Sequence, residues 1–375
     1  MASPKLPQPD SLFPDFRQIL ESGQLTKGRH LQRFEERSKE YLGVSECVGV
    51  SSCTSGLMLV LQALKRRQPS ETPARIAVPS FTFLASITAL VWAGFEPVFV
   101  DVDPESMNIC QKDLERVLKE EEVSGVLAVH CFGNPVPVEP ILELCRPHKI
   151  PLLFDAAHGF GSLYQGRKLG GQGWCQVYSL TPTKMVVAGE GGLVATEDRD
   201  LAAELRVARE YGNDGSYDTA FPGINARLSE LHACIAWNSL QMLEDVVAHR
   251  NRVACALTGA LGEIPGLGFQ RITPECRTTY KDFTITIDKD RFGASRDSVA
   301  LALEAEGVPS RKYFAPPCHQ HRAFRHFSKR ELPQTALLAS QCLSIPLLEL
   351  DTVEGIGTAF SRIQAYAQEI EERFS

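Results

Sequence analysis

Several features are missing from this sequence, and each absence excludes a class of protein. No apolar run reaches the about 20 residues that a membrane-spanning helix needs. The first residues, MASPKLPQPD, lack the apolar core of a secretion signal. The formal net charge is −7 and no block of Lys and Arg is present, so we expect no nucleic-acid partner. The sequence therefore predicts a cytoplasmic protein that does not bind membranes.

Paired cysteine motifs are also missing. The 11 cysteines are scattered, without a CxxC pair and without the Cys/His spacing of a metal site. An odd number of cysteines without a framework indicates free thiols in a reducing compartment, packed as small apolar groups. We therefore expect neither disulfides nor a metal.

What is present is an alternation of short apolar runs with helical patterns. With 375 residues, of which 43% are hydrophobic and 23% charged, the chain is large enough for one big domain and one smaller one. The alternation predicts an α/β fold with a mostly parallel sheet between layers of helices. We place a large domain at residues 1–245 and a smaller α/β domain at 246–375, and we find no internal repeat.

The expected elements follow from periodicity and from turn residues. Strands are predicted at 47–51, 75–79, 97–103, 126–130, 151–155, 177–180, 191–196 and 283–287. Helices are predicted at 12–20, 31–42, 57–64, 83–92, 111–121, 138–148 and 201–211, with one long helix from 230 to about 250. Residues 1–10 are expected to be disordered.

One stretch, VYSLTPTKMVVAGEGG from Val177 to Gly192, places a lysine just after an apolar run. Because Pro182 fits neither a helix interior nor a central strand, the run must break there and Lys184 must lie on a turn. Burial there would lower the lysine pKa, and a neutral amine is a nucleophile toward carbonyls. The alternative is a lysine that reaches from a strand end to solvent.

A carboxylate is expected close to this lysine. The run PLLFD, residues 151–155, predicts a buried strand that ends in Asp155. In pyridoxal phosphate (PLP) enzymes a carboxylate pairs with the pyridine nitrogen and keeps it protonated. Asp155 precedes Lys184 by 29 residues, which is enough for one strand, a loop and the next strand. A cap or turn residue is the alternative for Asp155.

Small hydroxyl residues open the helix predicted at 57–64, in the segment SSCTSG at 51–56. Hydroxyls and free N–H groups at a helix start bind anions, and phosphate above all. The alternative is an ordinary capped helix. Since ligands of parallel sheets bind outside the carboxyl ends of the strands, this segment, Asp155 and Lys184 should meet in one cleft.

Taken together, these segments resemble the nucleotide-sugar aminotransferases of the DegT/StrS type, a branch of the fold type I PLP enzymes. The matching pieces occur in the family's order and cover most of the chain from about residue 23 to 346. They are VSSCTSGLMLVLQAL, VPSFTFLASITAL, GFEPVFVDVDPESMNI, VHCFGNP, FDAAHGFGSLYQGRKLG, SLTPTKMVVAGEGG, GINARLSELHA, RKYFAPPCH and LSIPL. The family fold is a seven-stranded, mostly parallel sheet with a smaller C-terminal domain.

The resemblance also implies roles for individual residues. Lys184 would form the Schiff base with PLP, and Asp155 would pair with the ring nitrogen. His158 would approach the ring hydroxyl, and Phe83 would stack on the ring. The phosphate would be held by Ser52, Cys53, Thr54 and Ser179.

A homodimer with shared active sites is implied as well, because Asn225 matches a residue that reaches the phosphate from the partner subunit. We expect the segment from Gly223 to begin a helix, and we interpret Arg227 and Glu230 as structural. Three residues match the substrate side of the site: Thr26, Tyr313 and His319.

The expected activity is transfer of an amino group from glutamate or glutamine to a keto group of a nucleotide-linked sugar. A ketocyclitol (an inosose) is the alternative substrate. A non-catalytic PLP-binding regulator is a second hypothesis, and a nucleotide-binding oxidoreductase is a third, although no GxGxxG follows the first strand. A dehydrating branch of the family has His in place of the lysine, so Lys184 argues against that chemistry.

Overall fold

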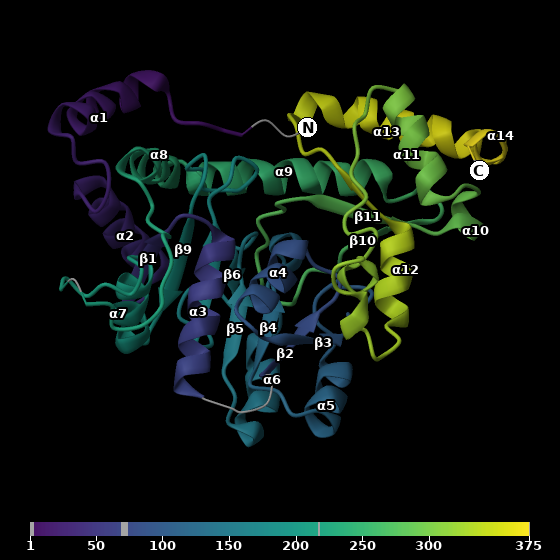
Figure 1. Cartoon of the computed structure of the whole chain (residues 1–375). Helices are drawn as coiled ribbons and strands as arrows, with labels where there is room; N and C mark the ends of the chain where they lie inside the picture. The colour runs from purple at the N-terminus through teal and green to yellow at the C-terminus, as the bar shows by residue number, and fades with distance from the viewer. Residues whose placement is uncertain (1–3, 69–73, 217, 375) are drawn as a thin grey trace.

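The computed structural model describes residues 4–68, 74–216 and 218–374, and a seven-stranded sheet lies at its centre (Figure 1). The strand order is β1-β9-β8-β5-β4-β2-β3. Neighbouring strands are parallel from β8 through β3, and β9 runs antiparallel to both of its neighbours. The predicted α/β fold with a mostly parallel seven-stranded sheet is confirmed.

The strands of this sheet are short and almost wholly buried. Their bounds are β1 (Glu46–Val50), β2 (Arg75–Pro79), β3 (Glu96–Val100), β4 (Gly125–Val129), β5 (Leu152–Asp155), β8 (Cys175–Ser179) and β9 (Gly192–Thr196). An antiparallel sheet follows later in the chain, made of β10 (Leu267–Phe269), β11 (Phe283–Ile287) and β12 (Cys342–Ile345). A short hairpin pairs β6 (Leu163–Tyr164) with β7 (Arg167–Lys168).

Helices cover both faces of the large sheet (Figure 1). They are α1 (Pro9–Ser22), α2 (Arg29–Leu42), α3 (Cys53–Arg67), α4 (Leu84–Trp92), α5 (Gln111–Glu120), α6 (Val138–Cys145), α7 (Arg199–Ala208), α8 (Glu230–Gln241) and α9 (Leu243–Leu261). Around the smaller sheet lie α10 (Lys289–Phe292), α11 (Arg296–Ala305), α12 (Pro333–Gln341), α13 (Val353–Ala365) and α14 (Ala367–Phe374). No helix within the described ranges is long and apolar enough to cross a membrane.

Each central strand supplies two cores, because successive side chains point to opposite faces. Val177 of β8 packs in the core with α3, α4 and α7, whereas Tyr178 packs in the core with α2 and α8. This two-sided burial explains why the strands are continuous apolar runs in the sequence.

Several predictions about the elements differ from the structure. The strand expected at 97–103 ends at Val100. After it, the Asp101 carboxylate accepts the backbone N–H groups of Val102 and Thr335, so the N–H of Val102 is not available to a neighbouring strand. The long helix expected at 230–250 is two helices, α8 and α9, which meet at Met242 without a Gly or Pro to mark the break. In the segment expected to be disordered, Pro9 and Asp10 belong to α1, and residues 1–3 lie outside the described residues.

The predicted domain boundary at residue 245 falls just inside α9, and we keep it as a proposal. A second hydrophobic core runs from Val253 to Ala367 and supports it. However, Cys318, Phe324 and Leu332 return to the core of the large sheet. The C-terminal part of the chain therefore packs against both cores.

Candidate active site

A cavity of about 310 Å³ opens where five strands of the large sheet end. Most of its lining comes from residues at or just after the ends of β1, β2, β4, β5 and β8. The predicted site residues that line it are Ser52, Cys53, Thr54, Phe83, Asp155, His158, Ser179, Lys184 and Tyr313. Residues more than 250 positions apart in the sequence thus line one cavity. It lies at the carboxyl ends of the strands, where we expected a cleft.

Lys184 lies on the turn that follows β8, as its sequence context predicts. Its backbone N–H donates to the carbonyl of Thr181 at 3.0 Å, which closes the turn around Pro182. Burial, followed by the positive charge of Lys281, lowers the pKa of the Lys184 amine to about 8. A substantial fraction of neutral amine is therefore present near pH 8, as a nucleophilic lysine requires.

The Asp155 carboxylate is held rigidly at the end of β5. The residue is 5% exposed. Ser86 donates its hydroxyl to Oδ2 at 2.6 Å, and the N–H of Ala157 donates to Oδ1 at 3.0 Å. Burial, followed by the negative charge of Asp155, raises the pKa of the neighbouring Cys53 thiol well above its ordinary value. Cys53 is therefore a neutral small side chain beside a fixed carboxylate.

His158 presents a buried nitrogen that has no partner. Its Nδ1 is buried without a hydrogen bond, and its ring lies parallel to that of Phe132 with centroids 6.3 Å apart. Burial lowers the pKa of His158 well below its usual range, and the charges of Lys184 and Lys281 act in the same direction. His158 is therefore a neutral imidazole at the cavity, and a ligand would have to supply the missing hydrogen-bond partner of its Nδ1.

The start of helix α3 forms one end of the cavity. Ser52 caps this helix, accepting the N–H of Ser55 at 3.0 Å. Ser179 and Thr181 contribute hydroxyls 3.3 Å apart to the same wall. A Cβ on Gly192 would lie 2.5 Å from the Ser52 carbonyl carbon, so glycine is required for β9 to pack against this turn. The helix start that we predicted as an anion site therefore lies at the cavity, and it also carries the ordinary cap that was the alternative.

Phe83 lies at the mouth of the cavity rather than in the core. It is 51% exposed and immediately precedes α4. An aromatic ring exposed at a pocket offers a flat face to a planar ligand. Tyr313 lies on another wall, where the Lys281 ammonium is 5.7 Å from its ring centroid.

Three predicted site residues lie outside this cavity. Thr26 is exposed and pairs with Ser229 in an isolated bridge. Asn225 is exposed and pairs with Glu210 in the same way. His319 is held by Ser80, whose hydroxyl lies 2.7 Å from its Nδ1.

The prediction that a helix begins at Gly223 is wrong. Helix α8 begins only at Glu230, with Ser229 as its N-cap, whereas Asn225 lies in an extended segment. The segment from Gly223 is held by backbone bonds to the end of α7, including Ile224 N–H to the Ala208 carbonyl at 3.0 Å. The extended pairing uses the backbone groups that a helix start would leave free.

The two residues interpreted as structural do have structural contacts. Glu230 is 2% exposed and accepts the backbone N–H groups at the start of α2. Arg227 pairs with Glu210 at 3.1 Å and lies over the ring of Tyr211.

Sequence reasoning missed several residues of this site. Lys281 and Asp282 line the cavity and form an ion pair at 2.9 Å, directly before the apolar strand β11. A charged pair at the edge of a buried strand was a usable signal for them. Ser86 lies within the apolar helix α4, and no local pattern marks it as the partner of Asp155. The remaining lining residues are Thr82, Ala85, Val129, Cys131, Ala157, Thr181, Thr183, Glu190 and Phe314.

The sequence and fold are similar to those of known proteins. Residues 10–360 match the family model described as the DegT/DnrJ/EryC1/StrS aminotransferase family. GDP-perosamine synthase from Caulobacter vibrioides is 30% identical over 325 residues, which are 85% of this chain and 85% of that protein. UDP-N-acetyl-3-dehydro-alpha-D-glucosamine 3-aminotransferase from Acidithiobacillus ferrooxidans is 30% identical over 365 residues, 95% of this chain and 94% of that protein.

Among solved structures, DesI crystallised with its TDP-sugar product superposes with a TM-score of 0.91 at 30% identity. The match covers 99% of this chain and 94% of DesI. The likeness therefore extends over both sheets and over all the segments that build the cavity.

Proposed function

The chain belongs to the DegT/DnrJ/EryC1/StrS aminotransferase family, and from this we propose that its cavity binds PLP and aminates a nucleotide-linked ketosugar. Glutamate or glutamine is the proposed amino donor. The observation that carries the proposal is Lys184, a buried amine with a pKa of about 8 in the same cavity as a fixed carboxylate. The names of the relatives contain three different nucleotides, GDP, UDP and TDP. We therefore propose a class of substrate, the nucleotide-linked ketosugars, without choosing one nucleotide.

The residues of the cavity fit PLP. Asp155 supplies a carboxylate for a protonated ring nitrogen, and the unpartnered Nδ1 of His158 can bond a ring substituent. The start of α3 and the hydroxyls of Ser179 and Thr181 suit a phosphate. When bound, PLP supplies an electron sink for the carbanion that forms as an amino group moves.

The protein's own residues then have distinct tasks. Lys184 Nζ can accept and return a proton near neutral pH, because its pKa of about 8 lies close to the working pH. Ser86 and the Ala157 N–H keep the Asp155 carboxylate in one orientation. The Lys281–Asp282 pair and Tyr313 form the wall on the side of the smaller sheet, where we place the substrate.

We also propose a homodimer with shared sites. Asn225 and Thr26 are exposed on the single chain. In a dimer, each subunit would bring these residues to the cavity of its partner, since they do not reach the cavity of their own chain.

We propose the cytoplasm as the location of the protein. All 11 cysteines are free thiols, which suits a reducing compartment.

Peptide mapping tests the lysine assignment. The purified protein should be yellow, and borohydride should fix the cofactor covalently on the peptide that contains Lys184. The matched control is Lys281→Ala, which removes the other lysine of the cavity and should leave this labelling in place. Labelling of Lys281 in the wild-type protein would overturn the assignment.

A substrate panel tests the rest of the proposal. The protein loaded with the amino group should convert at least one ketosugar among GDP-, UDP- and TDP-linked compounds, detected as a mass change of the sugar. Conversion of an inosose and of none of the nucleotide sugars would overturn the proposed substrate class. Lys184→Ala should abolish turnover while the circular dichroism spectrum stays unchanged.

A further inference from the structure

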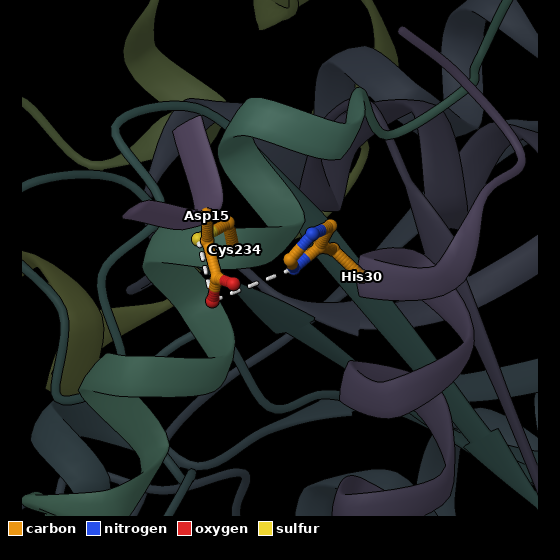
Figure 2. Close-up of side chains that lie close together, drawn as sticks. All are labelled: Asp15, His30 and Cys234. Carbon is orange, nitrogen blue, oxygen red and sulfur yellow. Dashed lines mark hydrogen bonds and ion pairs between the residues drawn. The ribbon is translucent and has the colours of Figure 1, made fainter. Parts of the chain in front are cut away.

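Away from the cavity, three side chains with metal-binding atoms come together from three helices (Figure 2). Asp15 belongs to α1, His30 to α2 and Cys234 to α8. The Asp15 Oδ2 atom lies 3.9 Å from His30 Nδ1 and 3.9 Å from Cys234 Sγ. One ligand atom from each residue lies within 4.8 Å of the other two. None of the three lines the proposed aminotransferase cavity.

The imidazole in this cluster is buried and lacks a hydrogen bond. His30 is 4% exposed, and among the residues that the structure describes neither of its ring nitrogens makes a hydrogen bond. Its Nδ1 atom lies 3.9 Å from the Asp15 carboxylate, which is too long for a hydrogen bond. Figure 2 shows this ring directed toward Asp15 and Cys234. A ring nitrogen without a hydrogen bond is free to bind a ligand, and its place beside a carboxylate and a thiol points to a metal ion.

We propose that Asp15, His30 and Cys234 bind a zinc ion, with a water molecule in the fourth position. Imidazole nitrogen, thiolate sulfur and carboxylate oxygen are the ligand atoms of zinc in proteins. With bond lengths of about 2.0–2.3 Å, the ligands of a tetrahedral zinc lie about 3.3–3.6 Å apart. Each distance to the carboxylate therefore has to shorten by about half an ångström. The proton of the Cys234 thiol leaves to solvent as the sulfur–zinc bond forms.

Two arginines near the carboxylate do not block this site. Arg29 and Arg33 lie 3.9 and 4.0 Å from the Asp15 oxygens, at the outer limit of an ion pair. Both have other partners, because Arg29 donates to Gln18 and Arg33 stacks over the Trp237 ring. Ion pairs of this length near the surface contribute little to stability, so zinc can replace them.

The position of the cluster gives the metal a structural task. Zinc would connect α1 and α2, on either side of the loop at residues 23–28, to the first turns of α8. One turn before Cys234, Glu230 already ties α8 to the start of α2. Bound zinc would therefore fasten the N-terminal helix to the body of the large domain, and it should stabilise the folded chain by mass action.

Metal titration of the holoenzyme tests this. The protein is first treated with a chelator, then titrated with zinc and dialysed to remove the excess. We expect about one zinc per chain by elemental analysis and a higher melting temperature with zinc than without it. Cobalt in place of zinc should give a thiolate-to-metal absorption band. Cys234→Ala and His30→Gln should lower zinc affinity about a hundredfold or more, since loss of an outer-shell partner alone costs 10- to 100-fold.

Two further variants decide the outcome if Cys234→Ala or His30→Gln folds poorly. Asp15→Asn changes a partly exposed carboxylate and should weaken zinc binding in a protein with unchanged circular dichroism. Cys255→Ser removes an exposed thiol of α9 and should bind zinc as the wild type does. No zinc above the buffer blank in the wild type, or equal affinity in Asp15→Asn and Cys255→Ser, would overturn the proposal.

Discussion

The ionisation states of single side chains decide what this cavity can do. Burial lowers the pKa values of Lys184 and His158. Because Lys281 lines the same cavity, its positive charge lowers the pKa of both residues. The Asp155 carboxylate instead keeps two hydrogen-bond donors. An amine near its pKa, a neutral imidazole and a fixed carboxylate thus stand in one cavity, each set by its neighbours.

Lys281→Met should make Lys184 a weaker nucleophile near neutral pH. Loss of a nearby positive charge raises the pKa of the Lys184 amine above its value of about 8. The reactive neutral amine exists above that pKa, so its population rises with pH and its midpoint moves to higher pH in the variant. The measurement is the rate at which cofactor-free protein captures PLP, followed by absorbance across pH.

The matched control for that experiment is Lys312→Met. Lys312 is 43% exposed and pairs with Asp297 outside the cavity, so its removal should leave the midpoint where the wild type has it. An unchanged midpoint in Lys281→Met would mean that Lys281 does not set the basicity of Lys184.

Among the elements, helix α2 depends on a residue about 200 positions away. Its N-cap position is Gly28, which has no side chain to accept the free N–H groups of the first turn. Glu230 of α8 accepts those of Gly28, His30 and Leu31 at 2.9, 2.8 and 3.1 Å. One buried carboxylate therefore caps α2 and fixes its angle to α8.

Glu230→Ala should lower the free energy of unfolding by about 3 kcal/mol or more. Hydrogen bonds to charged groups contribute about 1.5–3 kcal/mol each, and the substitution leaves three N–H groups without an acceptor. Glu230→Gln should fall in between, because its amide oxygen can still accept. Urea denaturation followed by circular dichroism measures both, with Glu36→Ala on the exposed face of α2 as the control. A loss no larger than that of Glu36→Ala would contradict this role.

At the scale of the whole molecule, the cavity is assembled from distant parts of the chain. The large sheet contributes Asp155 and Lys184, while Lys281 and Tyr313 come from the part that contains the smaller sheet. Asn225 lies outside the cavity of its own chain. The proposed dimer would supply it from the partner subunit, which makes assembly a condition of activity.

Mixing inactive variants tests this sharing. Lys184→Ala and Asn225→Asp should each be inactive, and a mixed dimer would hold one site with both lesions and one with neither. Activity should therefore reappear after mild dissociation and remixing, with subunit exchange followed by native mass spectrometry. Lys184→Ala mixed with Asp155→Asn is the control, because both residues line one chain's cavity and no intact site can form. Failure of the first mixture to recover, despite exchange, would place Asn225 outside the partner's site.

The sequence by itself determined the fold class and the order of most elements, and it predicted that Asp155 and Lys184 meet in one cleft, where both line the cavity. Buried parallel strands are continuous apolar runs, and Pro182 and the glycines at 189–192 break the chain where the structure turns. Asp155 and Lys184 could be found because Asp155 ends one such run and Lys184 lies on the turn after another. These are local signals that adjacent residues carry.

Only the tertiary structure decided which distant residues meet. The structure brings Ser86 to Asp155, Lys281 to the cavity of Lys184, and Glu230 to the start of α2. Each of these contacts joins positions 69 or more residues apart, and no period or spacing in the sequence encodes it. The same holds for Asp15, His30 and Cys234, which lack any metal-type spacing and come together because α1 and α2 pack against α8. Packing of side chains, and not the order of residues, sets these distances and the pKa values that follow from them.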